Sequence, residues 1–148
     1  KAAEALRLGA HAAILYREED FVARVRDLTG GRGVAVAYDS VGRDTFAGSL
    51  ACLAPRGHLV NFGKSSGPVE PFAVSSLGAK SNTLSRPMLF HYVAERPALE
   101  EAAAELFAAV GDGTLDIGDP ATLKLAEAGE AHRRLESRAT TGAVVLLP

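Results

Sequence analysis

The apolar run VAVAY at residues 34–38 is the strongest constraint on the fold, because it has no alternation of polar and apolar positions. Runs of this kind are typical of strands buried on both faces of a parallel sheet. Further short strands are predicted at residues 11–16, 58–63, 81–87 and 143–148, with helical patterns between them. Strands that alternate with helices over short loops favour an α/β fold with a doubly wound parallel sheet.

The helical segments are recognised by apolar residues at helical spacing. They are predicted at residues 2–8, 18–28, 44–53, 97–110 and 126–135, with one further helical turn at residues 74–79. A turn is expected at PRG, residues 55–57, between the predicted helix at residues 44–53 and the predicted strand at residues 58–63.

Composition narrows the class of protein. The 148 residues suit a single domain, and the net charge of -2, from 16 basic and 18 acidic residues with no block of like charge, indicates no nucleic-acid partner. No apolar run approaches the roughly 20 residues that cross a bilayer, so no membrane partner is expected. The single cysteine, Cys52, argues against a disulfide framework and favours a reducing, cytoplasmic compartment.

A glycine-rich run, TGGRG at residues 29–33, follows a predicted helix and precedes a strand. A phosphate-binding loop follows a strand and opens a helix, since the N–H groups of the helix amino terminus then face the anion. Here the order is reversed, so this run is interpreted as a helix end and a turn. The sequence contains no G-x-G-x-x-G in the context that dinucleotide binding requires.

Three predicted strands end on residues suited to a ligand. Tyr16 ends the first, Ser40 and Gly42 follow the second, and Phe62 and Gly63 end the third. Parallel strands bring their carboxyl ends to one edge of the sheet, where ligands of open α/β sheets bind. Two interpretations remain open, a cofactor-binding edge or ordinary turns, because the same small residues are also common in turns.

Other candidate groups give weaker signals. Lys1, Arg17 and Arg138 are each able to neutralise a phosphate or to remain solvated surface charges. The four histidines show no spacing typical of metal ligands, and Asp39 has no evident acid or base partner. No catalytic residue and no metal ligand is therefore predicted, and Cys52 is interpreted as a small core side chain.

Several motifs occur together in one order: DSVG at residues 39–42, NFG at 61–63, SRP at 85–87 and ESRATTG at 136–142. With these motifs the chain resembles the carboxyl-terminal half of NADPH-dependent quinone oxidoreductases. The resemblance is to their zeta-crystallin-like, zinc-independent branch of the medium-chain dehydrogenase/reductase superfamily. It extends over essentially all 148 residues.

The resemblance implies NADPH as the cofactor and assigns positions to it. These positions are Lys1, Tyr16, Ser40, Gly42, Phe62, Gly63, Ser65 and Arg138. By this resemblance, Lys1 and Tyr16 match residues that hold the adenosine 2′-phosphate. Ser40 and Gly42 match residues that line the cofactor cleft. Phe62, Gly63 and Ser65 match residues along the nicotinamide, and Arg138 matches a residue that reaches the cofactor from the final helix. A lysine at position 64 departs from the small polar residue expected there.

The resemblance also implies a larger architecture. Members of the family combine a GroES-like barrel, which supplies most of the substrate pocket, with a Rossmann domain that binds NADPH. Residues 1–148 correspond to the Rossmann domain without its first strands and its glycine-rich loop, and residues 117–148 to a segment that returns toward the catalytic domain. We therefore expect a fragment whose first strand lacks its neighbours and which self-associates. A homodimer is also expected, since family members dimerise through the sheet edge.

The function that the resemblance implies is hydride transfer from NADPH to a quinone or an activated alkene such as an enone. The protein would supply orientation and electrostatics while the cofactor supplies the chemistry. Two alternatives remain open: an enoyl-reductase module of a larger synthase, and a non-catalytic, crystallin-like structural or binding protein. By itself the fragment is expected to be inactive.

Overall fold

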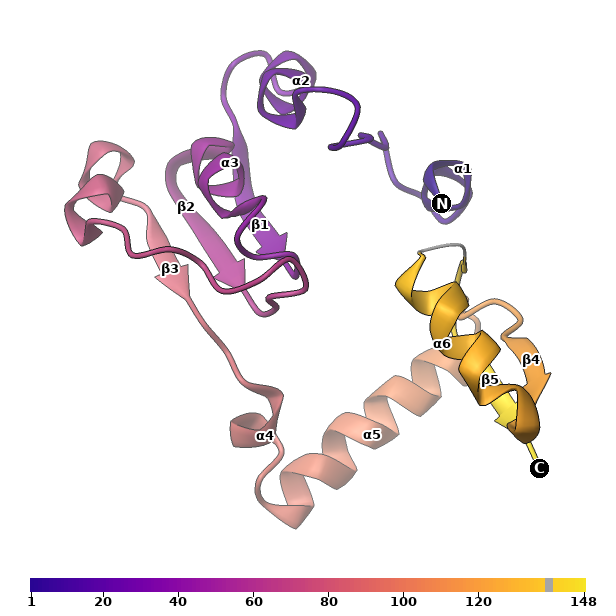
Figure 1. Ribbon diagram of the computed structural model, residues 1–148. Coiled ribbons are helices and arrows are strands. Elements are labelled where there is room, and N and C mark those ends of the chain that lie inside the picture. The colour runs from indigo at the N-terminus through magenta and orange to yellow at the C-terminus, as the bar shows by residue number, and fades with distance from the viewer. Residues whose placement is uncertain (138–139) are drawn as a thin grey trace.

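The computed structural model describes residues 1–137 and 140–148 and has an α/β architecture with two parallel sheets (Figure 1). The first sheet has three strands in the order β1-β2-β3, and the second has two. Their bounds are β1 (Val34–Asp39), β2 (Leu53–Asn61), β3 (Thr83–Ser85), β4 (Ala121–Lys124) and β5 (Val144–Leu147). The predicted α/β class with parallel strands is therefore confirmed.

Helices connect the strands. They are α1 (Ala2–Arg7), α2 (Phe21–Leu28), α3 (Phe46–Ala51), α4 (Leu89–Tyr92), α5 (Arg96–Gly111) and α6 (Ala128–Glu136), with 3-10 turns η1 (Val74–Lys80) and η2 (Leu125–Glu127). The α2 helix begins after Asp20, whose carboxylate accepts hydrogen bonds from the N–H groups of Val22 and Ala23. No helix in the described part of the chain is long and apolar enough to cross a membrane.

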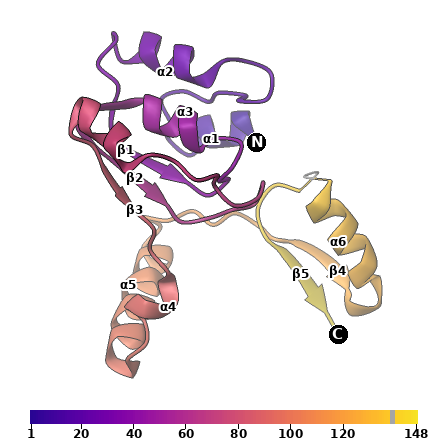
Figure 2. The ribbon, with the colours of Figure 1, turned by 60° about the vertical axis from the view of Figure 1, so that its left-hand side comes forward.

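The core lies where α3 covers the three-stranded sheet. Phe46 of α3 packs against Leu53 and Leu59 of β2, and both leucines are fully buried. The α2 helix packs on α3, where the ring of Phe21 occupies the space beside Gly48. In Figure 2, α2 and α3 lie on one side of this sheet, whereas Figure 1 shows α5 running from α4 toward the separate group of β4, β5 and α6.

Large apolar side chains remain outside this core. Tyr38 of β1 is 76% exposed, and α5 buries none of its residues although Leu106 and Phe107 are apolar. Among the described residues, α3 thus covers one face of the first sheet. The sequence predicted helices on both faces, but Tyr38 of β1 remains uncovered.

Residues 11–16 do not form the predicted strand. They run without sheet pairing until a turn begins at Tyr16, while β1 pairs with β2 alone. A strand needs a neighbour to satisfy its backbone N–H and C=O groups, and no described strand pairs with this segment. The apolar composition of HAAILY was therefore correct as a sign of partial burial but wrong as a sign of sheet structure.

Two other differences concern β2 and the later elements. The predicted turn at residues 55–57 lies inside β2, which absorbs it as an irregularity opposite Val34 and Val36, with Arg56 at a left-handed φ of 62°. The β4 strand and the short α4 helix were not predicted, because neither has a recognisable apolar period.

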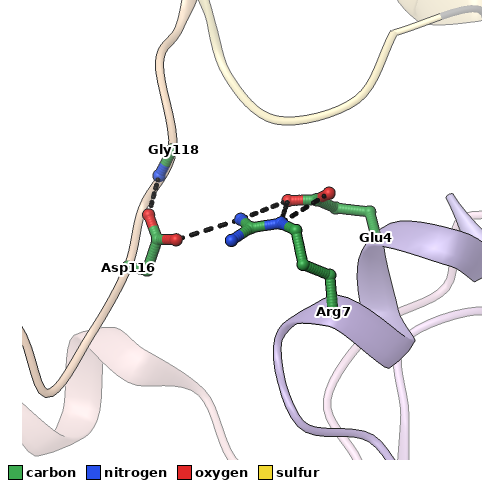
Figure 3. A network of polar contacts seen from close by, with 4 residues as sticks. All are labelled: Glu4, Arg7, Asp116 and Gly118. Atoms are coloured by element: carbon green, nitrogen blue, oxygen red, sulfur yellow. Dashed lines mark hydrogen bonds and ion pairs between the residues drawn. The ribbon is translucent and has the colours of Figure 1, made fainter.

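One polar contact joins α1 to the loop that follows α5 (Figure 3). The Arg7 guanidinium donates to Glu4 on its own helix at 2.7 Å and to Asp116 at 3.0 Å. Hydrogen bonds from the Gly118 N–H and then from Arg7 hold the pKa of Asp116 below its usual range. All three charged side chains are about half exposed, so the contact orients this loop more than it stabilises the fold.

Candidate functional site

The carboxyl ends of β1 and β2 lie side by side, because Asp39 is in register with Asn61. The Asp39 carbonyl accepts hydrogen bonds from the N–H groups of Phe62 at 2.9 Å and Gly63 at 3.3 Å, so the pairing continues past the strand. The Ser40 carbonyl in turn accepts from the Ser65 N–H at 3.3 Å. We call the two loops that meet here, residues 40–45 and 62–67, the strand-end lip.

The structure brings together five of the predicted positions in this lip: Ser40, Gly42, Phe62, Gly63 and Ser65. Phe62 is half exposed. The expectation that the ends of these two parallel strands form one edge therefore holds in the geometry, whereas the role of these residues toward a cofactor stays a prediction.

The glycines of the lip are required by the contact between its two loops. A Cβ atom on Gly42 would lie 2.7 Å from the Gly67 carbonyl oxygen, and Gly42 also has a φ of +90°. A Cβ atom on Gly63 would collide with the backbone of Ser40. Their first effect is thus to let one loop approach the other, which is a different reason from the ligand approach that the sequence suggested.

Asp39 holds the first loop of the lip. The residue is 4% exposed, and its carboxylate accepts hydrogen bonds from the N–H groups of Val41 at 2.9 Å and Gly42 at 3.0 Å. The Thr45 hydroxyl donates to both carboxylate oxygens at 2.9 Å, and the Ser49 hydroxyl donates to Oδ2 at 3.0 Å. All these partners are backbone amides and hydroxyl groups, so the contacts of this carboxylate hold the loop in place.

Asn61 ends the neighbouring strand with an unpaired donor. The residue is 5% exposed, and its Nδ2 atom is buried without a hydrogen-bond acceptor among the described residues. Buried amide groups are almost always hydrogen-bonded, because the desolvated donor otherwise costs about 1–3 kcal/mol.

The other predicted positions lie around a separate cavity of about 510 Å³ between α1 and residues 13–18. Lys1, Tyr16 and Arg17 line it, together with Ser137 at the end of α6. The structure therefore brings Lys1 and Tyr16 together, as the resemblance implied. Arg138 lies outside the described residues.

A second cavity of about 220 Å³ joins this region to the lip. Tyr16 and Ile14 line both cavities, and Ser40 and Asp39 line the second. A path of adjoining hollows thus runs from Lys1 past Tyr16 to the end of β1. The order of cation, aromatic ring and small hydroxyl along it suits a long ligand with an anionic end.

No metal centre emerges from the described residues. They contain no group of three or more His, Cys, Asp or Glu side chains that could hold a metal ion. His58 instead shares a hydrogen bond of 2.8 Å with Ser85 across β2 and β3. Cys52 is buried, and burial raises the pKa of its thiol, so it does not present a reactive thiolate at neutral pH.

Sequence reasoning missed Thr45, Ser49 and Asn61. The first two lie four residues apart, which is one turn along the start of α3, so both hydroxyls point to the same place. That spacing after a strand-ending aspartate was the available signal. The unpaired Asn61 amide had none, because the sequence does not show that this residue is buried.

Parallel α/β topology with a hollow edge at the strand ends defines a nucleotide-binding type of domain. A family model described as zinc-binding dehydrogenase matches residues 8–146, and the chain belongs to this family. The description mentions zinc, but the described side chains offer no matching donor set.

Individual relatives agree with this assignment. The chain is 45% identical to quinone oxidoreductase 1 of Escherichia coli and 43% identical to a 2-haloacrylate reductase of a Burkholderia species, in each case over 100% of its length. A crystal structure of E. coli quinone oxidoreductase complexed with NADPH matches 99% of the chain with a TM-score of 0.91, at 45% identity. The chain spans about half the length of these relatives, covering 46%, 45% and 46% of them.

Proposed function

We propose that this chain is the cofactor-binding part of an NADPH-dependent oxidoreductase that reduces a quinone or an activated alkene. The observation that carries the proposal is the path from Lys1 past Tyr16 to Ser40, which ends beside the strand-end lip. Relatives named quinone oxidoreductase and 2-haloacrylate reductase support both substrate classes. NADPH appears in the solved structure of one such relative.

The residues present suit this cofactor. The Lys1 ammonium and the Arg17 guanidinium line the first cavity, where they would neutralise the 2′-phosphate while the Tyr16 ring packs against the adenosine. Ser40, Gly42, Phe62, Gly63 and Ser65 would border the remainder, and Arg138, which lies outside the described residues, completes the proposed set. When bound, NADPH supplies the hydride.

The residues of this chain bind and orient rather than exchange protons. The donors and ring groups of the lip fix the position of the cofactor, and the exposed Phe62 excludes water from its reacting side. The charged side chains Arg43 and Asp44 of the lip pair with each other at 3.6 Å and are about half exposed, so they act as surface charges of the lip.

The remaining parts of the proposal concern assembly and location. We place the protein in the zeta-crystallin-like branch, as a cytoplasmic homodimer. Residues 1–148 form the Rossmann part, and residues 117–148 return toward a catalytic domain. The half-length coverage of the relatives supports a division into two parts.

The test is a titration of the full-length protein with NADPH and with NADH, followed by nicotinamide fluorescence. Tighter binding of NADPH, with oxidation of the bound nucleotide when a quinone or a 2-haloacrylate is added, supports the proposal. Absence of binding to either nucleotide by a folded sample contradicts it. Size-exclusion chromatography with light scattering tests the dimer.

A further inference from the structure

We propose that Asp39 is a positioning residue that holds both loops of the strand-end lip in the shape that binds the cofactor. This inference rests on the proposed function. It assigns a role to a side chain that ends β1 and lies below the lip, rather than to one that lines the lip itself.

Asp39 contacts each loop through a different group. Its Oδ1 atom accepts from the N–H groups of Val41 and Gly42, which fixes the turn of the first loop. Its main-chain carbonyl accepts from Phe62 and Gly63, which fixes the start of the second loop. The carboxylate thus fixes the first loop, and this loop in turn bonds the second directly, for example through the Ser66 N–H, which donates to the Val41 carbonyl at 2.8 Å.

The helix α3 locks the carboxylate in this orientation. The hydroxyls of Thr45 and Ser49 reach it from the first turn of the helix and the residue before it, and Thr45 is itself buried. Because the site is desolvated, removing the carboxylate leaves four donors without this acceptor, and the loop is expected to shift to regain partners. A helix in the core is thus linked to the geometry of an exposed loop.

The expected effect on the Kd for NADPH follows from the fraction of molecules whose lip has the shape that binds the cofactor. An apparent dissociation constant equals the intrinsic one divided by the fraction of competent protein. If Asp39→Ala leaves about a tenth of the molecules with the lip shaped as in the wild type, the Kd for NADPH rises about tenfold. Asp39→Asn keeps Oδ1 for the two N–H groups, and its new NH₂ group donates to the hydroxyl oxygens of Thr45 and Ser49. It therefore restores most of the affinity.

The matched control is Asn82→Ala, which removes a side chain that also ties backbone segments together. The Asn82 amide donates to the carbonyls of Ala54 at 2.8 Å and Gly57 at 3.3 Å, near the opposite end of β2. Its loss is expected to lower the stability of the sheet without changing the lip. Thr45→Val serves as a second variant that weakens the lock while leaving the carboxylate in place.

The experiment compares the Kd for NADPH, thermal stability, and amide hydrogen exchange at Val41 and Gly42 in the full-length protein. We expect Asp39→Ala and Thr45→Val to weaken binding and to speed exchange at these two amides, with Asp39→Asn close to wild type and Asn82→Ala affecting stability alone. If Asp39→Ala loses stability but binds NADPH as Asn82→Ala does, the positioning role is wrong and the proposed function stands. If the wild type binds no NADPH, both are wrong.

Discussion

Four glycines allow the two costs of adding a side chain to be separated by experiment. A substitution to alanine is strained where φ is positive, and it is also strained where the new Cβ atom meets other atoms. Gly42 has both features, with a φ of +90° and the Gly67 carbonyl oxygen 2.7 Å from the position that a Cβ atom would take. Gly113 has only the first, Gly57 only the second, and Gly78 neither.

The expected magnitudes follow from these features. The left-handed conformation costs an alanine about 1–2 kcal/mol, so Gly113→Ala lowers the free energy of unfolding by that amount. Overpacking costs about 1–3 kcal/mol, which is the expected loss for Gly57→Ala, whose Cβ would lie 2.9 Å from the Ala54 carbonyl oxygen. Gly42→Ala combines both and should cost about 2–5 kcal/mol.

Gly78→Ala is the reference variant, because no atom lies within 4 Å of its new methyl group. It is expected to stabilise the protein by about 0.4–1 kcal/mol, since alanine restricts the unfolded chain more than glycine does. Unfolding by guanidinium chloride, followed by circular dichroism and extrapolated to water, measures all four free energies.

The comparison between Gly42 and Gly113 decides the argument. If Gly42→Ala is no more destabilising than Gly113→Ala, the loops of the lip are not packed as closely as the structure has them. Gly42→Ala should in addition weaken NADPH binding, because the loop has to move away from Gly67. Gly113→Ala lies outside the lip and should leave the Kd unchanged.

Three further outcomes are expected. Lys1→Ala raises the Kd for NADPH about tenfold in the fluorescence titration, with little change for NADH, because only NADPH carries the 2′-phosphate; equal losses for both nucleotides would contradict this. Leu59→Ala lowers the free energy of unfolding by about 2–5 kcal/mol and the half-exposed Leu135→Ala by far less, as denaturant unfolding would show. Burial raises the pKa of the Cys52 thiol in the folded protein. The thiol therefore adds to the free energy of unfolding below the ordinary thiol pKa, and this contribution is lost as the pH rises above it. A Cys52→Ala variant should therefore show a flatter fall in stability at alkaline pH, and an equally steep fall would contradict the role of this thiol.

Local pattern predicted those parts of the fold whose stability is local or lies in the core. The helices at α1, α2, α3, α5 and α6 were found within a few residues, as were β1 and β5. The apolar run at residues 34–38 also predicted a strand in a parallel sheet, and β1 pairs in parallel with β2 over most of its length. Boundaries shifted where a hydrogen bond outside the pattern decided them, as at Asp20 before α2.

For the candidate site, the juxtaposition of the strand ends was predicted, whereas the role of these residues toward a cofactor stays a prediction. Reasoning from strand ends placed Ser40, Gly42, Phe62 and Gly63 at one edge, and the structure brings them together. It did not predict that a buried carboxylate organises that edge, because the sequence shows no acid or base partner for Asp39. Its partners are amides and hydroxyls, and two of them come from a helix that begins only after the loop has turned.

The segment at residues 11–16 explains why sequence pattern fails at particular places. A helix takes its backbone hydrogen bonds from residues close by in the sequence, and α1 forms from six residues of which none is buried. A strand takes its partners from elsewhere, and whether HAAILY becomes one depends on residues beside it rather than within it. The same dependence applies to the face of β1 on which Val36 and Tyr38 are exposed, because only an element packed against that face would bury them. Sequence reading is therefore reliable for β1 as a strand, whereas the burial of its side chains depends on elements that the run VAVAY does not contain.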